Sequence, residues 1–572
     1  MTIDLSAVPF STFGSFMCFN HLGAPGRDEA LCLRTMHGVM SSREALDLTL
    51  VRGRESLPFK EICTPASLRL ETKRGWAEIV FATPDTLRVR GRGVALRLRA
   101  RPGSHPYGIP VSPGIFHVKS PATRTNYMLR ALRGTLDVQH AWAPRPHERG
   151  TRFECPALAA TFVPDGAGAF EGTIEEFRTA WRPAAVDEPF DAVRRRVAAR
   201  WAAWLDSAPS VPKRYAAARE LAAYINWSAV VNPGGMLTRP TMLMSKNWMT
   251  QCWSWDHCFN AMATASMDAN LAWDQLMTLF DHQDAHGCLP DAVSAPMCVW
   301  DYCKPPVHGW ALRRMMRHKA QRAPRRLREI YPLLSRWTHW WLRFRDYDGD
   351  GIPQYHHGND SGWDNATVFD GGFAVESPDL AALLIVQMDV LADIAASLRK
   401  AREARQWKRR ADVMLDRLMR HSWSGAQFVS PRNGTHEVFP DGDCLLNFIP
   451  VVLGARLPKD VRAKLAAALE PGGRFVTRFG PATESPHSPL YTSNGYWRGP
   501  IWAPSTMLIV DGLAHAGFRA QAAMIARRFC DMCARSGFAE NFDALSGEPL
   551  CDRAYTWTSS VFLLLAHELT PA

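Results

Sequence analysis

The residues best suited to chemistry lie in one polar stretch, which runs from Asp346 to Asp370 and reads DYDGDGIPQYHHGNDSGWDNATVFD. It is too rich in Gly, Asp and Asn for a helix or a central strand, and it sets carboxylates beside aromatic rings such as Trp363. Chemistry on sugars uses that mixture, because flat apolar faces hold a sugar ring while acids move protons. A long polar loop inside a compact domain is usually functional. A turn-rich connection with solvated acids is the alternative interpretation.

Two loops before this stretch carry residues of the same types. One ends in WSWDHCF and places Trp255 and Asp256 at a helix start, where Asp256 has the alternative role of capping that helix. The other, HGCLPDAVSAPMCVWDYCKPPVHGWA, contains Trp300 and His308 around the start of the next helix. Both loops therefore supply candidates for holding a sugar.

Two loops near the C-terminus add an arginine and a second acid. The segment GYWRGPIW contains Tyr496, Trp497, Arg498 and Trp502. Arg498 could pair a catalytic carboxylate or a substrate oxygen, or it could form an ordinary structural pair with an Asp. In FAENFDALSGEPLCDRAYTW, Glu540 stands between apolar and amide neighbours. Partial desolvation there would tune its basicity.

Two kinds of region must position these loops. Residues 1–171 show short alternating segments broken by Pro and Gly, which predicts an N-terminal antiparallel β-sandwich. Residues 172–212, with GTIEEFRTAW and PFDAVRRRVAARWAAWLDSAP, have apolar residues at three- and four-residue spacing, which predicts a helical linker. Residues 213–572 are expected to form the catalytic domain, mainly α, with long loops.

The C-terminal region is expected to contain twelve helices. They are predicted near 214–231, 255–268, 271–282, 305–318, 325–344, 376–399, 401–421, 442–454, 458–469, 498–516, 518–535 and 555–569. Long loops enter every second helix, so six hairpins closed into a ring would place all the long loops at one end. This pattern predicts an (α/α)6 barrel with an acidic, aromatic bowl. A superhelix of helical repeats is the alternative, but the chain shows no fixed-period self-similarity.

Composition limits the classes of partner. The chain has 572 residues and a net charge of +11, with its basic excess in stretches such as 88–101 and 313–328. Neither stretch interleaves aromatic residues as single-strand binders do, so we expect a solvated basic surface and no nucleic-acid partner. The N-terminus does not resemble a signal peptide, no run of eighteen apolar residues occurs, and the 13 Cys show no disulfide framework. We expect a cytoplasmic protein with a small carbohydrate substrate and no membrane partner, and the oligomeric state stays open.

The Asp-rich start of the central stretch raises the question of a metal. Asp346, Asp348, Asp350 and Gly351 have the spacing that opens an EF-hand loop, but the twelfth position is His357 instead of Glu. Asp-Gly turns of this kind also form without metal. We expect no cofactor, with calcium at Asp346, Asp348 and Asp350 as the alternative.

Five motifs together resemble a known family. WSWDHCF, KPPVHGWA, GNDSGWDNAT, GYWRGPIW and ENFDALSGE, in this order within residues 240–570, resemble glycoside hydrolase family 63 and its neighbours. These include bacterial α-glucosidases, mannosylglycerate and glucosylglycerate hydrolases and, more distantly, trehalases. The β region is similar to the sandwich that some members carry before the barrel.

The resemblance implies an (α/α)6 barrel and an inverting mechanism on α-glycosides. It implies that Asp364 is the general acid and Glu540 the general base. It also implies that the sugar subsite is lined by Trp255, Asp256, His308, Trp363, Trp497, Arg498 and Trp557. A phosphorylase on the same barrel is one alternative, against which Glu540 argues, and a non-catalytic carbohydrate-binding protein is another. The sugar, the aglycone and the linkage stay open.

Overall fold

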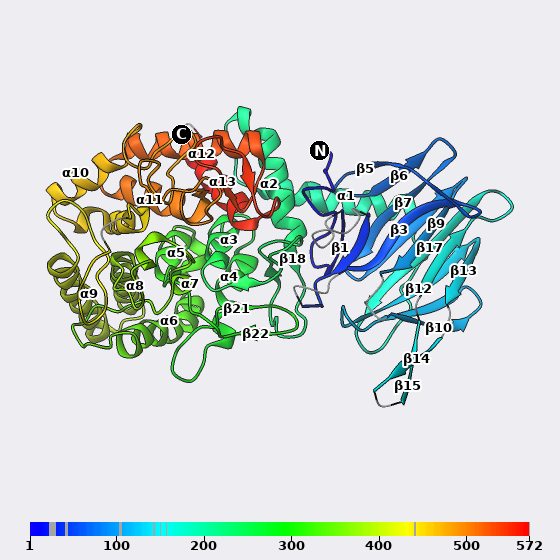
Figure 1. Ribbon diagram of the computed structural model, residues 1–572, viewed down its shortest axis with the longest axis horizontal. Helices are drawn as coiled ribbons and strands as arrows, with labels where there is room; N and C mark the ends of the chain where they lie inside the picture. The colour runs from blue at the N-terminus through cyan, green and yellow to red at the C-terminus, as the bar shows by residue number, and fades with distance from the viewer. Residues whose placement is uncertain are drawn as a thin grey trace. The chain divides into compact units, whose positions relative to one another are not determined.

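The computed structural model describes residues 1–21, 30–39, 44–101, 106–140, 143–148, 150–155, 157–439 and 442–570. The chain divides into two compact units. Unit 1 comprises Met1–Asp206, Trp227–Gly235 and Ser245–Thr250, and unit 2 comprises Ser207–Asn226, Met236–Met244 and Gln251–Ala572. Unit 1 is built mainly of strands and unit 2 mainly of helices (Figure 1).

Unit 1 is a β-sandwich. Its strands are β1 (Met17–Asn20), β2 (Cys32–Thr35), β3 (Glu44–Arg52), β4 (Glu55–Leu57), β5 (Lys60–Cys63), β6 (Leu68–Thr72), β7 (Gly75–Thr83), β8 (Thr86–Arg92), β9 (Ala95–Ala100), β10 (Tyr107–Ser112), β11 (Ile115–Ser120), β12 (Thr125–Arg133), β13 (Thr135–His140), β14 (Ala143–His147), β15 (Gly150–Glu154), β16 (Leu158–Val163), β17 (Ala169–Phe177) and β18 (Val230–Val231). Among the described residues, one large sheet has the order β1-β2-β3-β9-β16-β13, with β4 on β3, and the other has the order β10-β11-β12-β17-β8-β7-β6-β5. The sheets face each other where the rings of Phe162 in β16 and Phe170 in β17 stack, with centroids 6.1 Å apart. The predicted antiparallel sandwich is confirmed.

The first part of the expected helical linker is a strand instead. Residues 169–177 form β17, which lies between β12 and β8. Its polar Glu175 finds partners inside unit 1, because it accepts hydrogen bonds from Arg130 Nη1 at 2.8 Å and from Trp181 Nε1 at 2.7 Å. The pairing with β12 and β8 and the long-range contact with Arg130 outweigh the local helical spacing, as is common for strands. Helix begins only at α1 (Phe190–Ser207).

Unit 2 is mainly helical. Its helical elements are η1 (Lys213–Tyr215), α2 (Ala216–Ala229), α3 (Asp256–Thr264), α4 (Ala269–Met277), η2 (Phe280–His282), α5 (His308–Met315), η3 (Lys319–Arg322), α6 (Pro324–Phe344), α7 (Gly358–Ser361), η4 (Thr367–Phe369), α8 (Pro378–Ser397), α9 (Ala401–His421), η5 (Leu445–Arg456), α10 (Lys459–Ala468), α11 (Ala503–His515), α12 (Arg519–Ser536) and α13 (Thr556–Glu568). These elements include the twelve expected segments as well as the short elements η3, α7 and η4, which were not expected. The short strands are β19 (Thr241–Met242), β20 (Cys252–Trp253), β21 (Ala292–Val293), β22 (Cys298–Val299), β23 (Ile501–Trp502), β24 (Asn541–Phe542) and β25 (Pro549–Leu550).

Six of these helical elements close into an inner ring. Within the described part of unit 2, α3 contacts α5, and contacts continue through α8, η5, α11 and α13 back to α3. Each inner element follows an outer helix in the chain, which is α2, α4, α6, α9, α10 or α12. The long loops therefore enter the inner ring from the same end of each hairpin. The predicted (α/α)6 barrel is confirmed.

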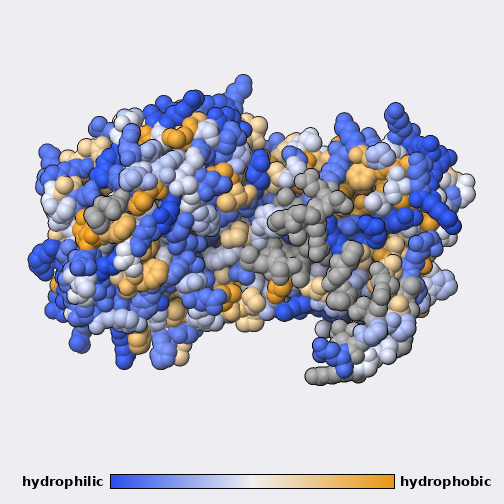
Figure 2. Space-filling view, viewed as in Figure 1, coloured by the Kyte–Doolittle hydropathy of each residue, from blue (hydrophilic) through white to orange (hydrophobic). Residues whose placement is uncertain are grey.

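The sequence explains which helices lie inside. All nine residues of α3 are buried, whereas α9 buries only Trp407, Ala411, Met414 and Leu418. That three- and four-residue spacing gives α9 a single apolar stripe, as expected for an outer helix. Its other face is charged, and hydrophilic side chains cover much of the surface of unit 2 seen in Figure 2.

One inner element is not an α-helix. The segment expected as a helix at 442–454 forms η5, a 3-10 element that contains Pro450 and bends at Gly454. Proline removes a backbone donor and disfavours a continuous α-helix. Gly454 has φ of 54°, and a Cβ there would stand 2.7 Å from His515 of α11, so the bend allows close packing.

Two observations bear on the composition. All 13 Cys fall within the described residues, and the structure places none of them in a disulfide bond. Among the described helices, α8 alone is long and apolar enough to cross a membrane, but 78% of its apolar window is buried inside the protein. Because α8 packs against α5, α6, α9 and η5, it is a core helix of the ring.

Candidate active site

Short strand pairs join the long loops at the mouth of the ring. In the loops before α3 and α5, β20 pairs with β21 and β21 with β22. In the loops before α11 and α13, β23 pairs with β24 and β24 with β25. The second pairing sets Trp502 opposite Asn541, the residue after Glu540. It therefore brings the aromatic loop and the acidic loop together.

Asp364 lies in a short turn between α7 and η4. The side chain of the next residue, Asn365, joins this turn to the loop before α11 by two hydrogen bonds. Its Nδ2 donates to the carbonyl of Gly495 at 3.0 Å, and its Oδ1 accepts from the backbone N–H of Trp497 at 3.0 Å. Asp364 is thus held against the segment that contains Tyr496.

Asp360 anchors the start of the same turn. It is 2% exposed and pairs with Arg345 Nη1 at 2.8 Å. Its carboxylate also accepts hydrogen bonds from the backbone N–H groups of Cys303 at 3.1 Å and His356 at 2.9 Å. Burial alone would raise the pKa of Asp360. The charge of Arg345 and these hydrogen bonds act in the opposite direction, and the pKa of Asp360 lies below its usual range.

Glu540 lies in the loop before α13 and is 4% exposed. The hydroxyl of Tyr496 donates to its Oε1 at 3.1 Å, and Trp557 Nε1 donates to its backbone carbonyl at 3.2 Å. Tyr496 has φ of 61°, a left-handed conformation that is uncommon for a residue with a side chain and that clusters at functional sites. Burial, followed by the charges of Glu540 and Asp364, raises the pKa of the Tyr496 hydroxyl. Both acids therefore lie within electrostatic reach of this one tyrosine.

Five tryptophans form a contiguous cluster beside these acids. Trp497 stacks on Trp502 with centroids 3.9 Å apart, and it also lies 4.8 Å from Trp363. Trp255 contacts Trp497 at 6.0 Å and Trp557 at 5.5 Å. The cluster draws on the loops before α3, α8 and α11 and on the first turn of α13. Each of the five side chains is at most 3% exposed, so the rings form a packed aromatic layer beside the acids.

A glycine makes room for this cluster. Gly362 has φ of 71°, and a Cβ there would stand 2.6 Å from the indole of Trp255. The position therefore requires glycine for its backbone and for its closeness to the ring. Gly362 sits two residues before Asp364, so it couples the aromatic cluster to the acidic turn.

Burial raises the pKa of both candidate acids. The pKa of Asp364 is raised by desolvation, against which the charges of Lys304 and His357 act. The pKa of Glu540 is raised to about 8, first by desolvation and then by the charge of Asp552. The predicted desolvation of Glu540 is confirmed in direction. Two carboxyl groups that hold protons more tightly than in water are suited to proton transfer.

Sequence reasoning missed a buried cation in this site. Lys304 Nζ lies 3.2 Å from Asp291 Oδ1 and donates to the carbonyl of Asn359 at 2.6 Å. Its charge also acts on Asp364 and Asp256. The residue was present in the motif KPPVHGWA, and Asp291 lies in the same loop, but Asn359 comes from α7 and Asp256 from α3.

Asp256 is a further buried acid, and it is the first residue of α3 rather than its cap. Burial raises its pKa to about 7, although Lys304 acts in the opposite direction. The hydroxyl of Tyr555, another residue that sequence reasoning did not single out, donates to Asp256 Oδ1 at 3.3 Å. Asp256 thus joins the acids of the site instead of capping a helix.

Three of the candidate residues lie outside this cluster of rings and acids. His308 is fully buried, and its ring packs against His257 at 5.2 Å and Phe280 at 5.3 Å. Trp300 is 47% exposed, and none of the ring contacts that join the five tryptophans involves it. Arg498 pairs with Asp370 and donates through Nε to the carbonyl of Asn365 at 2.8 Å. That arrangement matches the structural alternative for Arg498.

A large cavity lies elsewhere in unit 2. It has a volume of about 680 Å³ and opens between α6 and α9. Its lining includes Arg343, Arg409 and Asp346, but neither Asp364 nor Glu540. We assign the site to the loop end of the ring instead, because the buried acids and the tryptophans converge there.

Comparison with known proteins gives a consistent result. A family model described as "Mannosylglycerate hydrolase MGH1-like glycoside hydrolase domain" matches residues 249–558. A mannosylglycerate hydrolase of Thermus thermophilus is 23% identical over 54% of this chain and 93% of its own length. A glucosylglycerate hydrolase of Mycolicibacterium hassiacum is 23% identical over 54% of this chain and 90% of its own length.

Solved structures agree on the fold. The family 63 mannosylglycerate hydrolase of Thermus thermophilus in complex with glucose has a TM-score of 0.53 and 22% identity, and the match covers 60% of this chain and 98% of that one. A bacterial glucoamylase complexed with acarbose has a TM-score of 0.63 and 12% identity, covering 99% of this chain and 94% of that one. The second match extends over both units of the chain.

Proposed function

The chain belongs to the family of mannosylglycerate hydrolase MGH1-like glycoside hydrolase domains, and on that premise we propose that it hydrolyses a small α-glycoside with inversion at the anomeric carbon. The substrate class is a small α-glucoside or related α-glycoside, either an oligosaccharide or a solute of the glucosylglycerate type. Relatives named as mannosylglycerate and glucosylglycerate hydrolases support the second kind of substrate.

One observation carries the proposal. Two carboxyl groups from different loops, those of Asp364 and Glu540, both lie near the Tyr496 hydroxyl and are both desolvated. They stand beside a packed cluster of buried tryptophans. A binding module would need aromatic faces for a sugar, but it would not need two buried acids with raised pKa values.

Each acid has a defined role in the proposal. Asp364 protonates the glycosidic oxygen as the bond to the anomeric carbon breaks, and the leaving alcohol carries that proton away. Glu540 removes a proton from a water molecule, whose oxygen attacks the anomeric carbon from the opposite face. An inverting enzyme keeps its two carboxyl groups roughly 6.5–9.5 Å apart so that this water fits between them.

The raised pKa of Glu540 shapes how the reaction depends on pH. Glu540 must be ionised to act as a base, yet its pKa of about 8 keeps it largely protonated at neutral pH in the free protein. The reactive form, with Glu540 ionised and Asp364 protonated, is therefore a minor species. The profile of kcat/KM is expected to be bell-shaped, with apparent pKa values that belong to the pair.

A panel of α-linked disaccharides, glucosylglycerate and mannosylglycerate, incubated with and without phosphate, tests the proposal. We expect release of free sugar without phosphate, and loss of that release in Asp364→Asn and Glu540→Gln. Sugar phosphate formed only in the presence of phosphate would identify a phosphorylase. Binding without turnover across the panel would identify a carbohydrate-binding protein. Either result would overturn the hydrolase assignment.

A further inference from the structure

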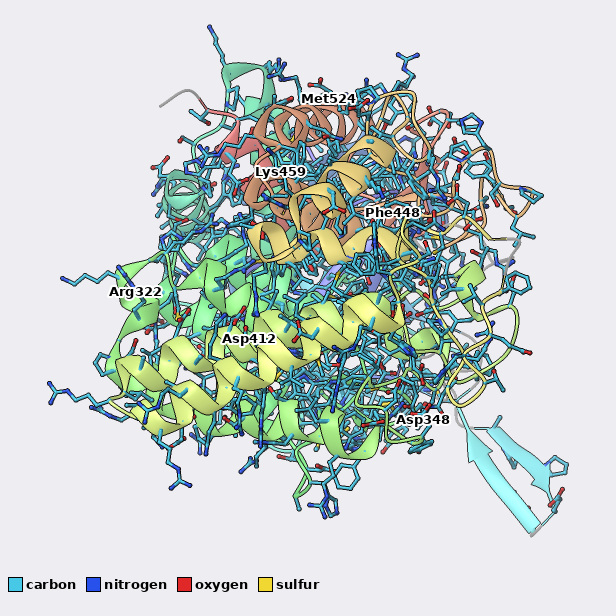
Figure 3. All side chains as sticks on the ribbon, turned by 90° about the vertical axis from the view of Figure 1, so that its left-hand side faces the viewer. Arg322, Asp348, Asp412, Phe448, Lys459 and Met524 are labelled. Carbon is cyan, nitrogen blue, oxygen red and sulfur yellow. The ribbon has the colours of Figure 1, made fainter. Side chains whose placement is uncertain are left out.

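A group of ligand-type side chains that the candidate active site does not use gathers at the C-terminal end of α9. Asp348 and Asp350 come from the loop after α6, Glu376 precedes α8, His421 ends α9, and His436 lies in the loop before η5. Figure 3 labels Asp348 in this region. One atom each from Asp350, Glu376, His421 and His436 lies within 4.8 Å of the others.

The imidazoles and carboxylates of this group point at one another. His421 Nε2 lies 2.6 Å from Glu376 Oε2, and its Nδ1 lies 3.4 Å from Asp350 Oδ2. His436 Nε2 lies 3.2 Å from Asp348 Oδ2, 3.9 Å from Glu376 Oε2 and 4.0 Å from Asp350 Oδ2. Ligand atoms around a tetrahedral ion with bonds of about 2.0–2.2 Å stand roughly 3.3–3.6 Å apart. Two of these separations, 3.2 and 3.4 Å, are close to that spacing, two are longer, and the contact between His421 Nε2 and Glu376 Oε2 is a direct hydrogen bond.

Glu376 is held in a manner typical of a metal ligand. Its side chain is fully buried, and Asn433 Nδ2 donates to its Oε1 at 2.9 Å. This hydrogen bond leaves Oε2 turned toward both imidazoles. Ligating carboxylates are commonly oriented by such outer partners.

We propose that Asp348, Asp350, Glu376, His421 and His436 bind one divalent transition-metal ion of the zinc class. Two imidazole nitrogens with carboxylate oxygens form a donor set that suits zinc and its neighbours in the first transition row. The ligands come from four separate segments of unit 2. The ion would therefore tie the start of the Asp346–Asp370 loop to α9 and to the loop before η5.

The same geometry argues against calcium bound by the aspartates alone. Asp346, Asp348 and Asp350 do approach one another within 4.8 Å. However, Asp348 Oδ1 accepts from the N–H of Asp350 at 3.3 Å, and Asp350 Oδ1 accepts from the N–H of Ile352 at 2.7 Å. Their Oδ2 atoms face the imidazoles, which are nitrogen donors that calcium does not favour.

Metal binding can be measured without any activity assay. The full chain, prepared without a histidine tag and stripped with a chelator, is titrated with Zn²⁺ by calorimetry and with Co²⁺ by visible absorption. We expect one equivalent of each metal to bind, ligand-field bands from bound Co²⁺, and a melting temperature that rises with the logarithm of free Zn²⁺. Calcium is expected to give no comparable shift.

Three variants sharpen the test. His436→Ala changes a half-exposed ligand, so the fold should survive, and Zn²⁺ affinity is expected to fall at least about 100-fold. Asn433→Ala removes the outer partner of Glu376 and is expected to lower affinity by about 10- to 100-fold. His318→Ala changes an exposed histidine outside the group and should bind Zn²⁺ like the wild type.

Two outcomes would overturn the proposal. One is a folded wild-type chain, shown by circular dichroism, that binds no stoichiometric Zn²⁺ or Co²⁺. In that case the group is a network of hydrogen bonds and ion pairs only. The other is Ca²⁺ binding that is equal in the wild type and in His436→Ala, which would assign the site to the aspartates. Neither result bears on glycoside hydrolysis, so the two proposals fail separately.

Discussion

The Tyr496 hydroxyl donates a hydrogen bond of 3.1 Å to Glu540 Oε1, from a backbone with φ of 61°. The donor and the acceptor belong to different loops, which the pairing of β23 with β24 holds together. A hydrogen bond to a carboxylate favours its ionised form. Tyr496 therefore acts against the desolvation that raises the pKa of Glu540.

Replacing Tyr496 by Phe should raise the pKa of Glu540 further above 8 and deprive the proposed base of its donor. Because a hydrogen bond to a charged group contributes about 1.5–3 kcal/mol, we expect kcat/KM at pH 7 to fall by about 10- to 100-fold. The loss should shrink as the pH rises toward 9. Tyr347→Phe, which changes a tyrosine that is 68% exposed, is the matched control. An equal loss at every pH would show that Tyr496 does not act through the ionisation of Glu540.

Variants of the two acids should respond differently to the leaving group. Asp364→Asn should lose orders of magnitude on a glycoside with a poor leaving group and much less on an α-glycosyl fluoride, which needs little protonation. Glu540→Gln should lose activity on both, since water must be activated in each case. Steady-state rates on the two substrates provide the measurement. Equal losses for both variants on both substrates would refute the division of roles.

The pH dependence of hydrolysis of the α-glycosyl fluoride also shows which of the two carboxyl groups acts as the general base. In Asp364→Asn the remaining activity depends on ionised Glu540, so it should rise with pH and level off above about 8. If Glu540 were the acid and Asp364 the base, Asp364→Asn would be inactive on the fluoride at every pH. The pH profile of this variant thus separates two assignments that give the wild type the same bell-shaped profile.

The buried Asp256 carboxylate, once ionised, should lower the free energy of unfolding at alkaline pH. Its pKa is about 7 in the folded chain against 3.8 ordinarily, so the folded state holds the proton more tightly than the unfolded state. The free energy of unfolding should therefore fall as the pH rises from about 4 to about 7. Asp256→Asn cannot ionise and so should not lose stability over this pH range. We expect its free energy of unfolding at pH 8 to exceed that of the wild type by on the order of 1–4 kcal/mol, with no gain at pH 4. Melting curves at both pH values, with Asp416→Asn on the exposed face of α9 as control, check this. A gain of the same size at pH 4 would contradict it.

Gly362 should tolerate no side chain. Gly362→Ala combines a left-handed backbone with a Cβ 2.6 Å from Trp255, so we expect it to lose stability and to displace the indole. Gly472→Ala is the control, because Gly472 has a similar φ of 74° and open space around its Cβ position. Melting temperature and tryptophan fluorescence are the measurements. If both variants behaved alike, backbone strain would explain the effect and the contact with Trp255 would not matter.

Much of the fold could be predicted because it depends on local periodicity. The alternation of short links and long loops was enough to place six inner elements, from α3 to α13. The failures have long-range causes. The segment of β17 has helical spacing, but Arg130 and the neighbouring strands decide its conformation. Pro450 and Gly454 turned an expected α-helix into η5.

The part of the site that lies in recognisable sequence motifs could be predicted. The loops with Asp364, Glu540 and the five tryptophans were identified from their composition, and the structure brings them together. Lys304 was missed because its partner Asn359 comes from α7, remote in the sequence, although its other partner Asp291 lies in the same loop. His308 could not be placed from sequence, because its position at a helix start does not show that its ring faces Phe280. The catalytic roles of Asp364 and Glu540 stay predictions.

The stereochemistry of the product tests the central claim most directly. Proton NMR of the anomeric region is recorded during the first minutes of hydrolysis of an α-glycoside, before mutarotation mixes the anomers. A general acid and a general base that activate water directly predict that the β-anomer appears first and that the α-anomer follows slowly. Initial appearance of the α-anomer would mean a retaining enzyme with a glycosyl-enzyme intermediate, and it would contradict the role proposed for Glu540.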